Sequence, residues 1–184
     1  YLQPDHAGRI TADQVEAALR EDTALVSIMA VNNETGNVYP IAEIARQLKA
    51  RKSRALLHTD AVQAFLKVPL HAQEDGADLI SLSAHKIGGP KGVGALYIAP
   101  ALQSKMIPLL RGGGQEQGLR SGTEATAQIA GFAKAVAQRA DQLEEILAHT
   151  RAMRDYALER LLSIPTVQVL GTPDAPHILC LTLP

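Results

Sequence analysis

Apolar positions along the chain follow two different spacings, which separate predicted helices from predicted strands. In residues 11–20 and 40–51 apolar side chains recur with helical spacing, which predicts two amphipathic helices. Thr11 and Gln14 fit a capping box at the start of the first helix, and Pro40 is suited to open the second. Between these helices and after them, the spacing gives way to short runs that are almost continuously apolar.

These apolar runs have the length of strands and alternate with the helices. They cover residues 24–31, 54–60, 77–83 and 92–98. Strands that alternate with amphipathic helices predict βαβ units, and therefore an α/β fold with a mostly parallel sheet flanked by helices. We expect the run 24–31 to be buried on both faces, because it contains few polar residues.

The second half of the chain has a different pattern. Residues 111–124 form a glycine-rich stretch, and residues 123–162 are helical in pattern almost throughout. A helix of that length is unusual in a globular domain, so we expect a break within it. Two further apolar runs, 166–171 and 177–183, predict strands of a second domain.

We therefore predict two domains. Residues 1–140 would form a large domain whose N-terminal part is missing, and residues 141–184 would begin a small, incomplete α+β domain. The chain starts at Tyr1 rather than Met and ends at Pro184 directly after an apolar run, so we expect both ends to be cuts in a longer protein.

Composition limits the partners. A formal net charge of −1 does not favour nucleic acid or a membrane surface, and the longest apolar runs are too short to span a bilayer. A single cysteine, Cys180, excludes an internal disulfide framework and fits the reducing cytoplasm. The histidines lack metal-ligand spacing with cysteines or acids, so we expect no metal site.

Polar side chains follow three of the predicted strands. Asn33 comes after the first strand, Asp60 ends the second and Lys86 follows the third. Each alone is more often an ordinary loop residue. Ligands of parallel α/β sheets bind beyond the carboxyl ends of the strands, however, so an amide, a carboxylate and an amine are expected at one edge.

This combination suits one cofactor. A desolvated lysine amine supports Schiff-base chemistry, and a buried carboxylate keeps a ring nitrogen protonated. Amides at Asn33 and Gln63 are suited to a phenolate-like oxygen, while Ser83 and His85 flank Lys86 and are suited to a phosphate. These are the requirements of pyridoxal 5′-phosphate (PLP).

Four motifs then make the resemblance specific. They are NNETG, HTDAVQ, SAHKIGGPKGVGALY and GGGQEQGLRSGTE, in that order. The series resembles the cysteine desulfurases of the NifS/IscS type, in the class V aminotransferase family of PLP-dependent enzymes of fold type I. The resemblance implies the large domain of that fold.

The resemblance also assigns roles. Lys86 would be the catalytic residue, which binds PLP covalently and then moves the α-proton of the substrate. The other cofactor-binding residues would be Asp60 at the pyridine nitrogen, Gln63 and Asn33 at the ring oxygen, Ser83 and His85 at the phosphate, and Thr123 at the phosphate of a neighbouring subunit. Thr123 also lies where we expect a helix to start, which favours anions.

The implied reaction removes sulfur from L-cysteine, giving L-alanine and a persulfide on an enzyme cysteine. It implies a homodimer and a sulfur-acceptor or scaffold protein in iron–sulfur cluster or thio-cofactor synthesis. Cys180 lies in an apolar strand without a neighbouring cation, so we do not expect it to be the nucleophile. The nucleophile would lie beyond Pro184, and these residues alone would be inactive as a desulfurase.

Three alternatives remain open from the sequence. Selenocysteine lyases share the motifs, and other class V enzymes, such as phosphoserine aminotransferases, share the fold, although the loop 112–124 counts against the latter. A non-catalytic interaction domain that keeps the fold and the dimer surface is the alternative from another class.

Overall fold

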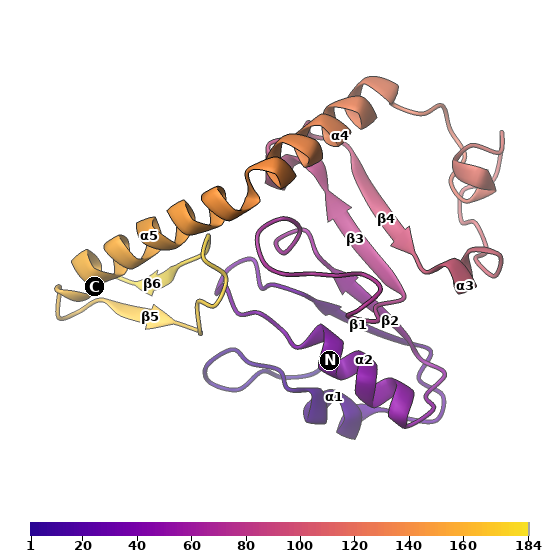
Figure 1. Cartoon of the computed structure of the whole chain (residues 1–184). Helices are drawn as coiled ribbons and strands as arrows, with labels where there is room; N and C mark the ends of the chain where they lie inside the picture. The colour runs from indigo at the N-terminus through magenta and orange to yellow at the C-terminus, as the bar shows by residue number, and fades with distance from the viewer. Residues whose placement is uncertain (184) are drawn as a thin grey trace.

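The main body of the molecule is a four-stranded sheet, seen in a computed structural model that describes residues 1–183 (Figure 1). The strands lie in the order β1 (Leu25–Met29), β2 (Leu56–Asp60), β3 (Leu79–Ser83) and β4 (Gly94–Ile98). The first three are parallel, and β4 runs antiparallel to β3. The predicted mostly parallel sheet is therefore confirmed.

Two helices form as the apolar spacing predicts. Helix α1 (Ala12–Ala18) begins with the predicted capping box between Thr11 and Gln14, and α2 (Ile41–Ala50) begins directly after Pro40. The buried residues of α2 recur at helical spacing and join the main core with residues from β2 and β3. The helices of the βα units thus cover one face of the sheet.

The two faces of the sheet differ in burial. Leu57 and Thr59 of β2 point into the core and are almost completely buried, whereas the other face carries exposed apolar residues, including Leu25 and Leu96. Every second residue of β1 is exposed. The expectation that this strand is buried on both faces is therefore wrong here, because within residues 1–183 only one face of the sheet is covered.

The C-terminal part consists of two helices and a hairpin. Helices α4 (Thr126–Asp141) and α5 (Leu143–Leu162) are separated at Gln142, so the predicted break is confirmed. Strands β5 (Gln168–Leu170) and β6 (Cys180–Thr182) pair antiparallel, and α5 runs alongside them (Figure 1). The division into domains at residue 140 stays a prediction.

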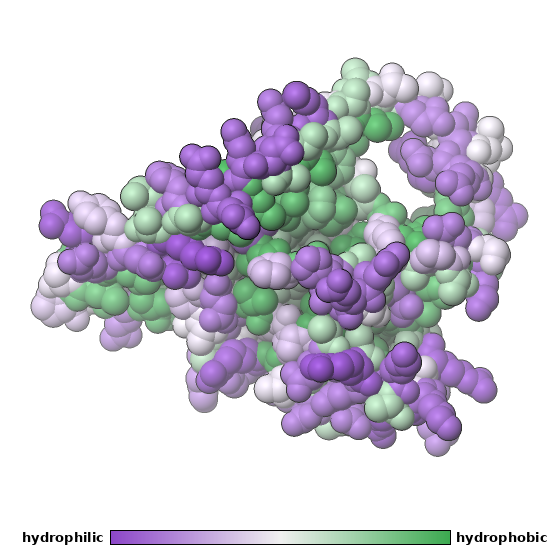
Figure 2. Space-filling model, in the orientation of Figure 1, coloured by the Kyte–Doolittle hydropathy of each residue, from purple (hydrophilic) through white to green (hydrophobic). Residues whose placement is uncertain are grey.

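Three short helices complete the described structure. They are η1 (Ala84–Ile87), α3 (Pro100–Gln103) and η2 (Glu116–Gly118). The segment that carries η2 stands away from the sheet, and Figure 2 shows an opening between it and the rest of the molecule. Within residues 1–183, no helix is sufficiently long and apolar to cross a membrane.

Asn37 ties three distant segments together. Its side chain is 1% exposed, and its Nδ2 donates to the carbonyl of Ala7 at 2.8 Å and to the hydroxyl of Thr172 at 2.7 Å. Its Oδ1 accepts from the backbone N–H of Thr172 at 3.3 Å. This amide therefore joins the N-terminal loop and the turn after β1 to the segment that follows β5.

We predict that Asn37→Ala lowers the free energy of unfolding by about 2–3 kcal/mol, because it removes three hydrogen bonds and leaves partly buried partners unsatisfied. Urea unfolding followed by circular dichroism measures the change. Asn33→Ala, at an exposed amide of the same turn, is the matched control and should change stability by less than about 0.5 kcal/mol. Equal effects of the two substitutions would contradict the role of Asn37.

Candidate functional site

Asp60 lies at the carboxyl end of β2, opposite Ser81 of β3. The side chain is exposed, and its Oδ1 accepts the backbone N–H of Val62 at 2.9 Å. This hydrogen bond orients the carboxylate and leaves the second oxygen without a hydrogen-bond partner within the described residues. Asp60 therefore offers one positioned acceptor at the sheet edge.

The chain after Asp60 folds into a helical turn over residues 61–68. Backbone N–H groups of Phe65 and Val68 donate to carbonyls four residues earlier, at 2.8 and 3.0 Å. Helical spacing places Gln63 and Lys67 on the same side of this turn. The Nζ of Lys67 donates to Oε1 of Gln63 at 2.9 Å.

Lys86 is carried by the short helix η1, directly after β3. A 3₁₀ helix brings residues three apart onto one face. Ala84 and Ile87 accordingly point into the protein and are 0% and 5% exposed, while His85 and Lys86 are exposed. The Oγ of Ser83 and the Nδ1 of His85 lie 2.7 Å apart.

A second apolar cluster holds these segments together. Its buried members are Ala84, Ile87, Phe132 and Ala135, with Phe65 packed against them. The rings of Phe65 and Phe132 meet edge to face with their centroids 6.5 Å apart. The turn 61–68, helix η1 and helix α4 are thereby fixed relative to one another.

Asn33 and Thr123 lie in irregular segments and are exposed. Neighbouring Asn32 shapes the turn that carries Asn33, because its Oδ1 accepts the N–H groups of Glu34 and Thr35. Helix α4 begins at Thr126, so the expectation that Thr123 lies at a helix start is wrong. The functional roles of Asn33 and Thr123 stay predictions.

His58 lies on the same face of β2 as Asp60. Its Nδ1 is 2.8 Å from the hydroxyl of Ser27, and its Nε2 is 2.9 Å from that of Ser81. Both ring nitrogens are therefore occupied, which agrees with the interpretation of His58 as a histidine that the protein itself satisfies.

Lys67 is not among the site residues predicted from the sequence. Its side chain is only 6% exposed. Burial, with the charges of Arg139 and Lys86, lowers the pKa of Lys67 to about 8. The four-residue spacing from Gln63 could have indicated that the two side chains meet. The burial of Lys67 has no comparable signature in the sequence.

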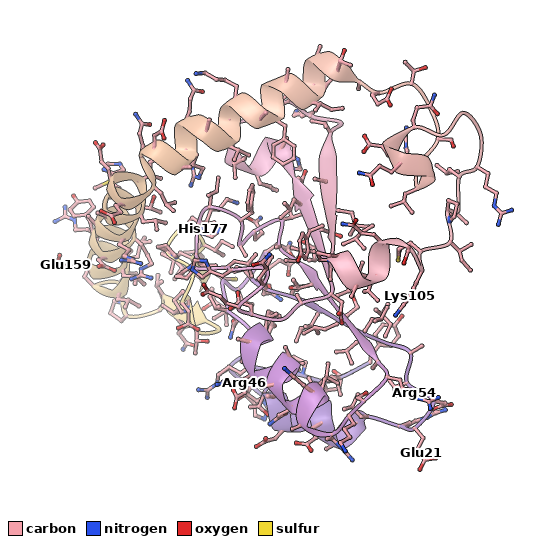
Figure 3. The ribbon with its side chains drawn as sticks, turned by 45° about the vertical axis from the view of Figure 1, so that its right-hand side comes forward. Glu21, Arg46, Arg54, Lys105, Glu159 and His177 are labelled. Atoms are coloured by element: carbon pink, nitrogen blue, oxygen red, sulfur yellow. The ribbon has the colours of Figure 1, made fainter. Side chains whose placement is uncertain are left out.

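His177 belongs to the segment between β5 and β6 and lies beside the loops of the main sheet (Figure 3). Burial, with the charges of Lys67 and Arg139, lowers the pKa of His177 to about 4. Both ring nitrogens are buried, and neither has a hydrogen-bond partner among the described residues. The imidazole is therefore neutral at pH 7.

The candidate residues lie apart from two surface hollows beside α2. Tyr39 and Leu70 line one hollow, and Leu48 and Asp78 line the other, while none of the candidate residues lines either. Chemically, the candidate residues offer a carboxylate acceptor, an amide donor, a hydroxyl–imidazole pair and an exposed primary amine. This set suits a polar aromatic ligand that carries an anionic group.

Known proteins similar to this chain agree on one family. The family model "Aminotransferase class-V" matches residues 1–184. The chain is 43% identical over 174 residues to the mitochondrial cysteine desulfurase of Saccharomyces cerevisiae, covering 95% of this chain and 35% of the yeast protein. It is 43% identical to the cysteine desulfurase IscS of Vibrio atlanticus, covering 96% of this chain and 44% of that protein.

A solved structure gives the same result. The crystal structure of DndA from Streptomyces lividans matches with a TM-score of 0.86 and 40% identity, over 97% of this chain and 51% of that chain. The chain therefore belongs to the class V aminotransferase family. It spans less than half of the length of the curated relatives that it matches.

We predict that acid destabilises the protein partly through His177. The pKa of His177 is about 4 in the folded protein, below the ordinary value of 6.5, so below pH 6.5 the unfolded chain binds a proton that the folded chain does not. This stability is fully present above pH 6.5 and is lost as the pH falls towards 4. We expect His177→Leu to remove on the order of 1–2 kcal/mol of this dependence.

Urea unfolding at pH values from 4 to 7 provides the measurement for this prediction, with the exposed His149→Leu on α5 as the control. His149→Leu should keep the acid dependence of the unmodified protein. Parallel curves for the unmodified protein and His177→Leu would show that His177 is not the titrating group.

Proposed function

We propose that this chain provides most of the cofactor site of a PLP-dependent cysteine desulfurase. Such an enzyme removes sulfur from L-cysteine and gives L-alanine and a persulfide on an enzyme cysteine. The observation that carries the proposal is that one apolar cluster joins the segments of Gln63 and Lys86, beside Asp60 at the end of β2, in a chain 43% identical to a cysteine desulfurase.

The donor set fits PLP. When bound, PLP supplies an aromatic electron sink that acidifies the α-hydrogen of an amino acid. Asp60 would accept a hydrogen bond from the pyridine nitrogen through its open oxygen, and Gln63 and Asn33 would donate to the ring oxygen. Ser83 and His85 would hold the phosphate. Lys86 would bind the cofactor covalently and accept the α-proton at its Nζ.

Cys180 is not assigned the sulfur-accepting role. It lies in β6, paired with β5, and is partly buried. Within residues 1–183, no hydrogen bond joins Cys180 to a cation that would favour its thiolate, which is the nucleophilic form of cysteine. This cysteine is better explained as a small apolar residue of the hairpin.

We infer that the protein acts as a homodimer. The segment between α3 and α4 exposes Ile107, Leu109 and Leu110, which are 80%, 95% and 54% exposed. Exposed apolar residues gathered on one segment are typical of a protein interface. Thr123 lies on the same segment, which supports its role at the phosphate of the partner subunit.

The remaining parts of the proposal rest on the relatives alone. A sulfur-acceptor or scaffold protein in iron–sulfur cluster or thio-cofactor synthesis would receive the sulfur. A cytoplasmic location stays a proposal, because the relatives include a mitochondrial protein as well as a bacterial one.

The function is tested by locating covalently bound PLP. We expect borohydride to fix PLP on the Lys86 peptide of the full gene product that carries this sequence, as measured by mass spectrometry. Lys86→Ala should lose both this attachment and sulfide release from L-cysteine, while Lys91→Ala, in the following loop, should keep the attachment. Attachment at another lysine, or no attachment, would overturn the proposal.

The dimer is tested at Leu109. We predict that Leu109→Lys converts the gene product to a monomer, because it places a charge in an apolar interface, and that PLP affinity falls at least about tenfold with it. Analytical ultracentrifugation measures the association state. Met153→Lys, at an exposed apolar residue of α5, is the control and should remain dimeric. A dimeric Leu109→Lys variant would contradict this surface.

A further inference from the structure

Lys67 is a buried lysine without an acidic partner. Its side chain is 6% exposed, and within residues 1–183 no aspartate or glutamate forms a salt bridge with it. The charged or titratable groups facing it are Arg139 of α4, Lys86 of η1 and His177. Burying a cation among like charges is costly, so its position requires an explanation beyond stability.

The one hydrogen bond of the Lys67 side chain within the described residues is with Gln63. The ammonium lies 2.9 Å from Oε1 of the Gln63 amide. An ammonium only donates hydrogen bonds, so the amide oxygen of Gln63 must face Lys67. In the flipped amide, the NH2 group of Gln63 would face the ammonium, and both groups would be donors. The Nε2 of Gln63, which carries two hydrogens, is therefore left to donate elsewhere.

We propose that Lys67 is a positioning residue that holds the Gln63 amide with its N–H groups directed to an anionic ring oxygen of the cofactor. This inference rests on the proposed function, because it deepens the role given to Gln63 in binding PLP. The charge of Lys67 polarises the amide as well, which strengthens the donor at Nε2.

The cluster around the turn makes this arrangement stable. Phe65, between the two residues, packs edge to face on Phe132, and the Nε of Arg139 donates to the carbonyl of Leu66 at 2.9 Å. The backbone that carries Gln63 and Lys67 is thus fixed against α4 by two contacts. The remaining freedom of Gln63 is in its side chain, and Lys67 restricts that freedom.

A double-mutant cycle in the full gene product tests the proposal. PLP is titrated into the unmodified protein, Lys67→Met, Gln63→Ala and the double variant, and the dissociation constant is measured by absorbance. We expect each single substitution to weaken binding about tenfold, and the double substitution to weaken it no further, because Lys67 acts through Gln63. Lys134→Met, an exposed lysine of α4, controls for the lost charge.

The outcomes separate this inference from the proposed function. Independent losses that multiply to about a hundredfold, or unchanged affinity in Lys67→Met, would overturn the positioning role while the function stands. No PLP binding by the unmodified protein would overturn both. Urea unfolding of the apoprotein checks folding, and Lys67→Met should be at least as stable at pH 7, because it removes a buried unpaired cation.

A second readout needs no cofactor. In the apoprotein, the side-chain amide resonances of Gln63, observed by ¹⁵N–¹H NMR, should shift with a midpoint near pH 8, where Lys67 loses its proton. Lys67→Met should abolish this titration, while Lys134→Met should keep it. If the chemical shifts of the Gln63 side-chain amide do not change with pH in the unmodified protein, the contact between Lys67 and Gln63 is refuted, and the proposal with it.

Discussion

The arrangement of the candidate site depends on the packing of one small apolar cluster. Ala84 and Ile87 of η1 lie against Phe132 of α4, and Phe65 joins them from the turn after β2. The sheet alone fixes only the ends of β2 and β3. Directly beyond these ends, single backbone hydrogen bonds continue the pairing, from the N–H of Ala61 to the carbonyl of Ser81 at 3.0 Å and from the N–H of Ala84 to that of Val93 at 3.2 Å. Farther along each segment, side-chain packing holds the chain. Protein interiors are close-packed, so a shift of the Phe65 or Phe132 ring would move Gln63 and Lys86 relative to each other.

Glycines permit the close approaches that this packing requires. A Cβ at Gly94 would lie 2.5 Å from the backbone oxygen of Leu82, where β4 leaves the loop after η1. A Cβ at Gly131 of α4 would lie 2.8 Å from Cγ of Pro90 in the same loop. Gly94, in the glycine-rich motif after Lys86, therefore has a structural role beside any contact with a ligand, because it lets β4 approach β3. Gly131 does the same for α4, which approaches the loop after Lys86.

The sequence predicted those parts of the structure that depend on local pattern. The capping box of α1 and the position of Asp60 at a strand end follow from spacing within a few residues, and a break between α4 and α5 follows from the length of the helical pattern, although its place at Gln142 was not predicted. The burial of β1 was mispredicted because burial depends on which distant segments pack on each face of the sheet, and the residues of the strand itself do not specify those segments. Lys67 was missed because the same letters in an open loop would give an ordinary solvated lysine; only the tertiary fold of the turn 61–68 buries it.

The charges around this turn explain why the C-terminal segment matters to the site. Lys67, Arg139 and His177 come from three separate segments. Burial and the charge of Arg139 lower the pKa of Lys67, and burial with the charges of Lys67 and Arg139 lowers the pKa of His177. The segment that carries His177 contributes a neutral imidazole rather than an acid, so it excludes water from Lys67 without neutralising it. A lysine shielded in this way keeps a strong preference for the oxygen of Gln63, since no other acceptor among the described residues competes for its proton. The neutral imidazole of His177 thus helps to keep the Gln63 amide in one orientation, because it adds no acceptor that would draw the ammonium of Lys67 away.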